Sequence, residues 1–159
     1  MDKKKIYQSA PLPFMGQKRM FVKEFRKVLG QFPDDAVYID LFGGSGLLAH
    51  VTRCEKPASR VVYNDFDNYR QRLANVGRTN ALLAELREMV REGPRGKLLS
   101  KELHERIIRR LEAEEAGGFV DYITLSSSLL FSMKYAVSLA ALRKESFYNN
   151  VKQIGRAHV

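Results

Sequence analysis

The chain has 159 residues, of which 45% are hydrophobic and 28% charged, a balance that gives no sign of disorder and predicts one modest core. Cys54 is the single cysteine, which excludes an internal disulfide and a cysteine metal cluster within one chain. The formal net charge of +9 favours a polyanionic partner such as nucleic acid, although most cationic residues alternate with acidic ones, as they also do on solvated helix faces.

Residues 1–17 predict an extended basic leader, because Pro11 and Pro13 prevent a helix there. No apolar segment follows the charged start, so we expect no secretory signal and a cytoplasmic location. Apolar residues at helical spacing then predict a helix over 18–29, which Gly30 ends.

A strand, a glycine-rich turn, a helix and a second strand follow within about thirty residues. The strands are expected at 37–42 and 60–63, with a helix at 47–53 between them. The helical crossover of such a βαβ unit makes its two strands parallel. Parallel strands predict an α/β fold in which both faces of the sheet are covered.

The second half of the chain shows helical patterns and no further strand. We expect a helix over 69–91, a turn at 93–96, and a helix that Ser100 caps and that runs to residue 116. The longest apolar segment, 123–142, is interrupted by polar residues and predicts a buried helix, not a membrane span. This half is expected to be a mostly helical insert or subdomain.

The glycines after the first expected strand indicate a ligand. Gly44 and Gly46 begin a G-x-G-x-x-A pattern that ends at Ala49, and Asp65 lies about twenty residues further on, after the second strand. A tight turn between a strand and a helix requires the same glycines without binding any ligand. Here the preceding strand, the following helix and the trailing acid favour binding of a nucleotide or nucleoside.

Asp40 separates the candidate ligands. A carboxylate at the end of the first strand repels the pyrophosphate that a dinucleotide places over such a turn, whereas the ammonium and sulfonium of S-adenosylmethionine are cationic. Asp65 is then expected to accept hydrogen bonds from the ribose, Phe14 to pack against the ligand and Lys18 to pair with its carboxylate. The alternative for Asp40 is an acid satisfied by backbone N–H groups at a helix start.

Three motifs together resemble those of the Dam-type (D12 class) adenine-specific DNA methyltransferases: Phe14-x-Gly16-x-Lys18, Tyr38-Ile39-Asp40-Leu41-Phe42-Gly43-Gly44, and Val62-Tyr63-Asn64-Asp65-Phe66-Asp67. Their order and spacing agree with that family over residues 11–72. The resemblance implies a Rossmann-like S-adenosylmethionine-dependent methyltransferase fold with a mostly helical target-recognition insert. It implies cofactor contacts for Phe14, Lys18, Asp40, Phe42, Gly43, Gly44 and Asp65, to which the glycine pattern adds Gly46.

The resemblance implies methyl transfer from S-adenosylmethionine to adenine N6 of double-stranded DNA, in a bacterial or phage-encoded protein that flips the base into a pocket. That family holds the adenine amine with a D-P-P-Y tetrapeptide, and this chain contains no Pro-Pro dipeptide. We therefore expect a truncated chain: the N-terminal part of the cofactor domain at 1–72, a partial recognition region at 73–153 and a non-native tail at 154–159. Such a fragment is expected to be inactive and poorly soluble alone.

Two other functions stay open. An NAD-dependent oxidoreductase shares the glycine pattern and Asp65, but it leaves Asp40 and the leader motif unexplained. A non-catalytic DNA-binding module explains the missing tetrapeptide without truncation.

The remaining candidates are weaker. Phe147 and Tyr148 are expected either to stack on bases or, as is commoner for aromatic residues after an apolar segment, to lie in the core. His50, His104 and His158 lack metal-ligand spacing, so no metal site is expected.

Overall fold

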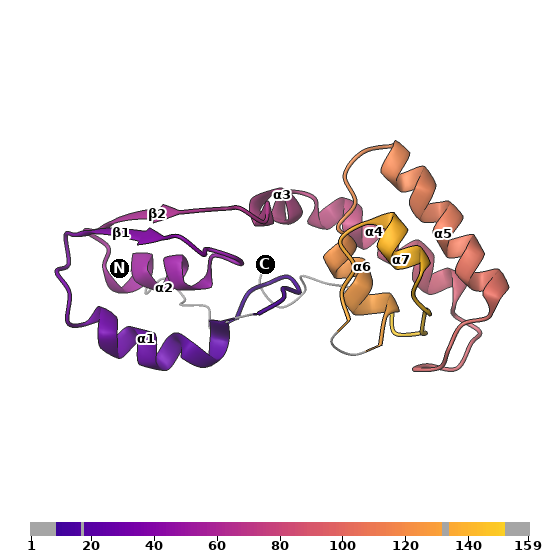
Figure 1. Cartoon of the computed structure of the whole chain (residues 1–159), viewed down its shortest axis with the longest axis horizontal. Coiled ribbons are helices and arrows are strands. Elements are labelled where there is room, and N and C mark those ends of the chain that lie inside the picture. The colour runs from indigo at the N-terminus through magenta and orange to yellow at the C-terminus, as the bar shows by residue number, and fades with distance from the viewer. Residues whose placement is uncertain (1–8, 17, 132–133, 152–159) are drawn as a thin grey trace. The chain divides into compact units, whose positions relative to one another are not determined.

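The computed structural model describes residues 9–16, 18–131 and 134–151 (Figure 1). The chain divides into two compact units, Met1–Gln71 and Arg72–Val159. The division falls within the helix α3 (Tyr69–Ala74).

In its described residues the first unit has two strands and two main helices. In chain order its elements are the 3₁₀ turn η1 (Lys18–Phe21), α1 (Val22–Leu29), β1 (Val37–Asp40), α2 (Leu47–Glu55) and β2 (Arg60–Tyr63). The strands pair in parallel, with Asp40 opposite Tyr63, which confirms the orientation predicted from the βαβ pattern. This parallel pair is compatible with an α/β fold.

Helix α1 packs on α2 because its apolar residues recur at helical spacing. Val22 of α1 and Leu47 and Val51 of α2 are buried together, and Phe25 packs against them. In Figure 1 both helices lie on the same side of the β1–β2 sheet.

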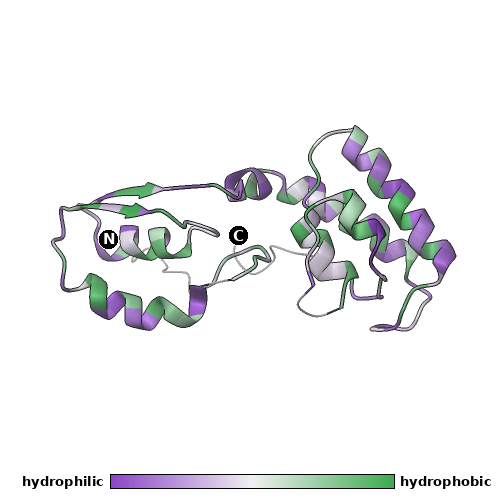
Figure 2. Ribbon diagram, viewed as in Figure 1, coloured by the Kyte–Doolittle hydropathy of each residue, from purple (hydrophilic) through white to green (hydrophobic). Residues whose placement is uncertain are grey.

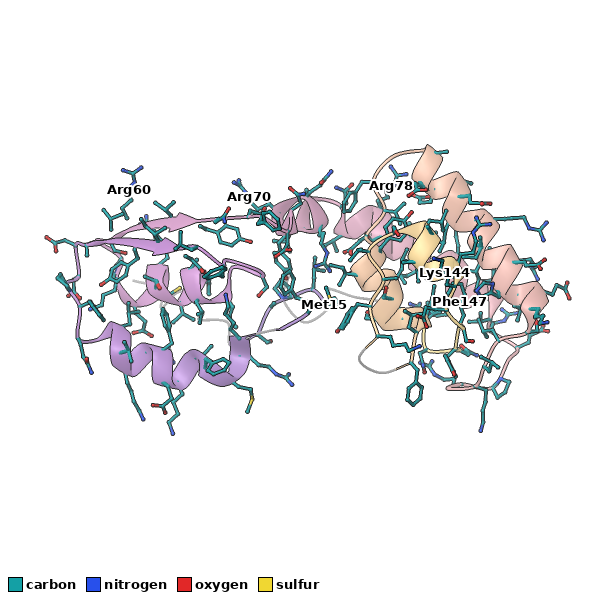
Figure 3. All side chains as sticks on the ribbon, in the orientation of Figure 1. Met15, Arg60, Arg70, Arg78, Lys144 and Phe147 are labelled. Carbon is teal, nitrogen blue, oxygen red and sulfur yellow. The ribbon has the colours of Figure 1, made fainter. Side chains whose placement is uncertain are left out.

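The other face of the sheet is apolar and exposed. Val37, Ile39 and Val62 are 58%, 62% and 39% exposed, and Figure 2 shows both strands as hydrophobic. Figure 3 shows Arg60 extending from that same face, away from α2. Among the described residues of this unit no element covers it, although parallel sheets normally bury both faces.

Strand β1 is shorter than predicted and α2 is longer. The strand ends at Asp40, whose carbonyl accepts from the backbone N–H of Asn64 at 3.1 Å, so Leu41 and Phe42 lie beyond the sheet. Both side chains are exposed there. The expected strand over 37–42 was therefore wrong in its last two residues, because an apolar run does not show where pairing stops.

The second unit is helical. Its elements after α3 are α4 (Val76–Met89), α5 (Lys101–Ala116), α6 (Tyr122–Leu129) and α7 (Leu139–Arg143). The Ser100 hydroxyl accepts from the backbone N–H of Leu103 at 3.2 Å, which confirms the predicted cap of α5. The expected helix over 69–91 breaks at Asn75, where the backbone leaves helical geometry between α3 and α4.

The expected single helix over 123–142 was wrong. Helix α6 ends at Leu129, Leu130 is extended, and α7 begins only at Leu139. The chain turns back after α6 because of a hydrogen bond: the buried Ser126 hydroxyl accepts from the backbone N–H of Ala136 at 2.7 Å. Ser138 then caps α7 by accepting from the backbone N–H of Ala141 at 3.2 Å.

The core of this unit joins all four helices. Its members include Leu83 and Leu86 of α4, Ile107 and Leu111 of α5, Leu125 and Leu129 of α6, and Leu142 of α7. Phe147, labelled in Figure 3, is only 1% exposed, and its ring centroid lies 4.2 Å from that of His104. Phe147 is thus a core residue. None of the helices in the described residues is both long and apolar enough to cross a bilayer.

Candidate functional site

The segment that joins β1 to α2 is shaped by glycines. A Cβ atom at Gly43 would lie 2.2 Å from Tyr63 Cε2 and 2.6 Å from the Asn64 carbonyl oxygen, so only glycine fits. Gly44 and Gly46 have φ angles of 51° and 71°, where an L side chain is strained. One glycine thus permits a close contact and two permit the backbone conformation.

Tyr63, the last residue of β2, holds this loop. Its hydroxyl lies 2.6 Å from the Gly44 carbonyl oxygen and 3.0 Å from Asp65 Oδ1, and it can donate to either acceptor. Burial, reinforced by the hydrogen bond to Asp65, raises the pKa of the Tyr63 phenol well above its ordinary value of 10.0. The phenol therefore stays a donor at neutral pH.

The leader lies against the same loop. The rings of Phe14 and Tyr69 meet edge to face with centroids 5.7 Å apart, and Phe14 Cε1 would be 3.1 Å from a Cβ atom at Gly44. Lys18 Nζ donates a hydrogen bond to the carbonyl oxygen of Phe42. Phe14 and Lys18, both singled out from the sequence, thus reach the glycine loop.

An open pocket of about 480 Å³ lies where the leader, the loop after β1 and the loop after β2 meet. Its volume falls within the usual range for small-molecule sites, and its lining is mainly apolar. Phe42 and Phe66 line it while remaining 82% and 85% exposed. The carboxyl end of parallel strands is where α/β sheets bind ligands.

Five of the predicted contact residues line this pocket, namely Phe14, Lys18, Phe42, Gly43 and Gly44. Asp40, Gly46 and Asp65 are not among the residues that line it. Gly46 instead precedes α2, and a Cβ atom there would lie 3.6 Å from the Tyr63 ring. The structure therefore gathers three separated motifs around one cavity and leaves three of the predicted contacts outside its wall.

Asp65 is engaged inside the protein. Its Oδ1 accepts from the backbone N–H of Tyr69 at 2.6 Å, and its Oδ2 accepts from that of Arg70 at 3.0 Å. These two bonds satisfy the first two N–H groups of α3, and the Tyr63 hydroxyl is a third neighbour of the carboxylate. The acid that lines the pocket is Asp67, which the sequence did not single out as a ligand contact.

Asp40 ends β1 with an unsatisfied oxygen. Its Oδ2 is buried and has no hydrogen-bond partner among the described residues. The residue lines a smaller cavity of about 130 Å³ together with Tyr38, Leu48 and Thr52. The alternative considered for Asp40 was an acid whose oxygens accept from backbone N–H groups. This alternative does not hold for Oδ2. Oδ2 is therefore open to a hydrogen-bond donor that the described residues do not supply.

Sequence reasoning missed the contribution of the loop after β2. Asn64, Phe66 and Asp67 line the pocket, and Asn64 Nδ2 donates to the carbonyl oxygen of Leu41 at 3.0 Å. The available signal was a phenylalanine between two acids directly after a strand, an unlikely place for a core residue. Among the described residues no three His, Cys, Asp or Glu side chains gather as metal ligands; His158 lies outside them.

Over 158 residues the chain is 40% identical to a protein of Haemophilus influenzae named "Putative methyltransferase". The match covers 96% of this chain and 53% of that protein, so the chain spans about half the length of its relative. No family model and no solved structure matches the chain. The likeness supports a methyltransferase, and with it S-adenosylmethionine as the usual methyl donor, and it does not favour the oxidoreductase.

Proposed function

We propose that this chain is the cofactor-binding part of an S-adenosylmethionine-dependent methyltransferase that acts on adenine N6 of double-stranded DNA. The observation that carries the proposal is the convergence of Phe14, Lys18, Phe42, Gly43 and Gly44 on one pocket. These residues come from motifs that resemble the Dam-type family. The relative's name supports the methyl transfer, and the DNA acceptor rests on the motif resemblance.

The residues of the pocket suit each part of such a cofactor. Lys18 gives one donor to the Phe42 carbonyl and keeps two more for a carboxylate. The exposed rings of Phe42 and Phe66 offer faces on which an adenine can stack. Asp67 and Asn64 supply an acceptor and an amide for ribose hydroxyls or an ammonium group.

The electrostatics favour a cationic ligand without phosphate. Asp67 places a carboxylate in the wall of the pocket, which disfavours a pyrophosphate there. Asp40, at the end of β1, lies outside that wall and has a buried oxygen without a partner among the described residues. Bound S-adenosylmethionine would supply a sulfonium methyl group: an amine nitrogen would bond to the methyl carbon as its carbon–sulfur bond breaks, the sulfur would leave as a neutral thioether, and the amine would lose a proton to water.

Turnover is not expected from this chain. It contains no Pro-Pro dipeptide, so the tetrapeptide that holds the adenine amine in the Dam-type family is absent from its sequence. The residues described here bind and orient the methyl donor. The acceptor amine has to be held by other groups.

The test is isothermal titration calorimetry of the chain with S-adenosylmethionine and, separately, with NAD. We expect heat from the first and none from the second. Phe42→Ala should weaken binding about tenfold through lost stacking. Phe32→Ala, which removes a ring that is 53% exposed in the same unit but does not line this pocket, should leave affinity unchanged.

The two acids after β2 give a sharper contrast. Asp67→Asn should lower affinity for S-adenosylmethionine with little change in the free energy of unfolding, because Asp67 is exposed and lines the pocket. Asp65→Asn should lower the free energy of unfolding, because it weakens the cap of α3. The absence of heat from the wild-type chain would refute the proposal. DNA binding by such a chain would then favour the non-catalytic module.

A further inference from the structure

An apolar groove of about 330 Å³ lies between α1 and β1 in the first unit. Phe25, Val28 and Phe32 line it on the side of α1 and the turn that follows, and Val37 and Ile39 line it on the side of β1. Figure 2 shows hydrophobic residues on both elements. None of these residues lines the pocket of the candidate site. We call this second hollow the edge groove.

The backbone of β1 is open on the side of the edge groove. The Ala36 and Asp40 carbonyls accept from N–H groups of β2 and of the residue after it, at 3.2 Å and 3.1 Å. Because alternate residues of a strand turn their backbone groups to opposite edges, Val37 and Ile39 turn theirs away from β2. Among the described residues neither has a backbone partner on that side. Such an edge is a template for one more strand.

The surroundings of this edge define what kind of strand fits it. Side chains directed toward the helices would meet Val28 and Phe32, which are 51% and 53% exposed. The alternate side chains would continue the exposed apolar face that Val37 and Ile39 form. A strand covered on both faces is nearly continuous in apolar residues. The edge groove therefore fits a short extended segment that is apolar at consecutive positions.

A second copy of this chain does not meet that requirement. If two β1 strands paired antiparallel about a two-fold axis, each would keep its helix-facing side chains on the helix side of the joined sheet. Those side chains are Tyr38 and Asp40, which line the small cavity against α2. Asp40 would then lie over the apolar wall of the other copy, which is costly for a carboxylate. The charge of β1 thus disfavours self-pairing.

The length of the relative indicates a source for the strand. The Haemophilus influenzae protein matches 96% of this chain with 53% of its own length, so a little under half of it has no counterpart here. The described residues of this chain supply a sheet of two strands, whereas sheets usually have about four to six. The unmatched portion of such a protein is therefore large enough to contribute further strands.

We propose that the edge groove is a docking site for an apolar β-strand from the polypeptide portion that the relative has beyond the match, and that this portion also binds when it is a separate chain. The strand pairs with the backbone of Val37 and Ile39 and covers Val28 and Phe32 with its side chains. In strand addition, main-chain hydrogen bonds give affinity and the pockets for alternate side chains give specificity. This role goes beyond the proposed function and does not depend on the methyl donor or acceptor.

The test produces the 159-residue chain together with the unmatched portion of the Haemophilus influenzae protein, as two polypeptides. We expect them to sediment as a one-to-one complex. Amide hydrogen exchange at Val37 and Ile39 should be at least about tenfold slower in the complex than in the chain alone, because both N–H groups become paired. The N–H of Asn64, which is already bonded to the Asp40 carbonyl, is the internal control and should change less.

Two variants test the groove itself. Val28→Glu puts a charge where the strand packs and should weaken the complex at least about tenfold. Phe32→Ala removes a ring from the same wall and should weaken it about tenfold, with no change in affinity for S-adenosylmethionine. Val137→Glu is the matched control, because Val137 is 67% exposed in the second unit and does not line the groove.

Each outcome decides the matter. A complex that neither Val28→Glu nor Phe32→Ala weakens would overturn the docking site, and protection of Val37 and Ile39 by self-association of the chain would show a second copy in its place. If the separate portion does not fold, the two portions are joined in the relative's order, and fast exchange at both amides there also overturns the inference. A failure to bind S-adenosylmethionine would remove the proposed function alone.

Discussion

The sharpest prediction concerns Gly43, because a single added methyl group meets two different obstacles. The Cβ atom of Gly43→Ala would lie 2.2 Å and 2.4 Å from two carbons of the Tyr63 ring and 2.6 Å from the Asn64 carbonyl oxygen. Ordinary contacts to a Cβ atom begin at 3.4 Å, so each neighbour has to move by roughly an ångström. Backbone conformation is not the obstacle, since only Gly44 and Gly46 of this loop have positive φ.

Neither neighbour of Gly43 moves easily. The Tyr63 ring is held at its far end by the hydroxyl contacts to Gly44 and Asp65, and the Asn64 oxygen belongs to the backbone directly after β2. Overpacking of this kind costs about 1–3 kcal/mol. Because a backbone atom is involved, we expect a loss of about 3 kcal/mol, equivalent to somewhat more than a hundredfold in an equilibrium constant. If the loop keeps its conformation, the strain lowers the free energy of unfolding. If the loop moves to relieve the strain, the pocket is distorted and affinity for the ligand falls instead.

The assays are urea unfolding and calorimetry with S-adenosylmethionine. Gly77→Ala is the control: Gly77 is the second residue of α4 and a Cβ atom there meets nothing within 4 Å, so this variant should lose no stability and gain at most about 1 kcal/mol. In a Tyr63→Ala background Gly43→Ala should cost less, since only the carbonyl contact remains. If Gly43→Ala matched the wild type in both assays, the close packing of the loop against β2 would be refuted.

Three other predictions concern burial and charge. Asp121→Ala should destabilise the second unit by about 3–5 kcal/mol, because it removes the carboxylate that lies 2.9 Å from the buried guanidinium of Arg72. Glu88→Ala, from an exposed pair, should cost less than about 1 kcal/mol, and urea unfolding distinguishes the two variants. Burial lowers the pKa of His50 below its ordinary value of 6.5, so the unfolded state binds more protons between the two pKa values and stability falls as pH falls through that window. His50→Gln should remove that part of the decline, measured as the difference in unfolding free energy between about pH 8 and about pH 5. Ile39→Thr should reduce 8-anilinonaphthalene-1-sulfonate fluorescence and raise soluble yield by interrupting the exposed apolar face of the β1–β2 sheet, and unchanged fluorescence would contradict it.

The parts of the fold that sequence predicted well depend on local signals. The parallel pairing of β1 and β2 follows from the crossover helix between them, and the start of α5 follows from the cap at Ser100. The break between α6 and α7 was not predictable in this way. It depends on the Ser126 hydroxyl meeting the backbone ten residues later, which is a tertiary contact without a sequence period.

In the candidate site, too, the sequence predicted which residues gather but not how each side chain is oriented. The glycine pattern and the family resemblance identified Phe14, Lys18, Gly43 and Gly44, and the structure brings these four to one pocket. Asp65 was expected as a ligand contact from its spacing and from the family motif, but neither shows which way a carboxylate turns. Its oxygens accept from the start of α3, and two residues later Asp67 lines the cavity.

Tyr63 explains why the pocket needs residues that do not line it. Strand alternation turns this tyrosine toward the glycine loop, where its ring makes Gly43 obligatory and its hydroxyl contacts Gly44 and Asp65. One side chain thus connects the loop after β1 to the cap of α3. A tyrosine in a strand is common, so nothing in the sequence marks it. The shape of the cavity is therefore set by the contact of a strand side chain with the glycine loop, and the residues that would bind the ligand depend on that contact.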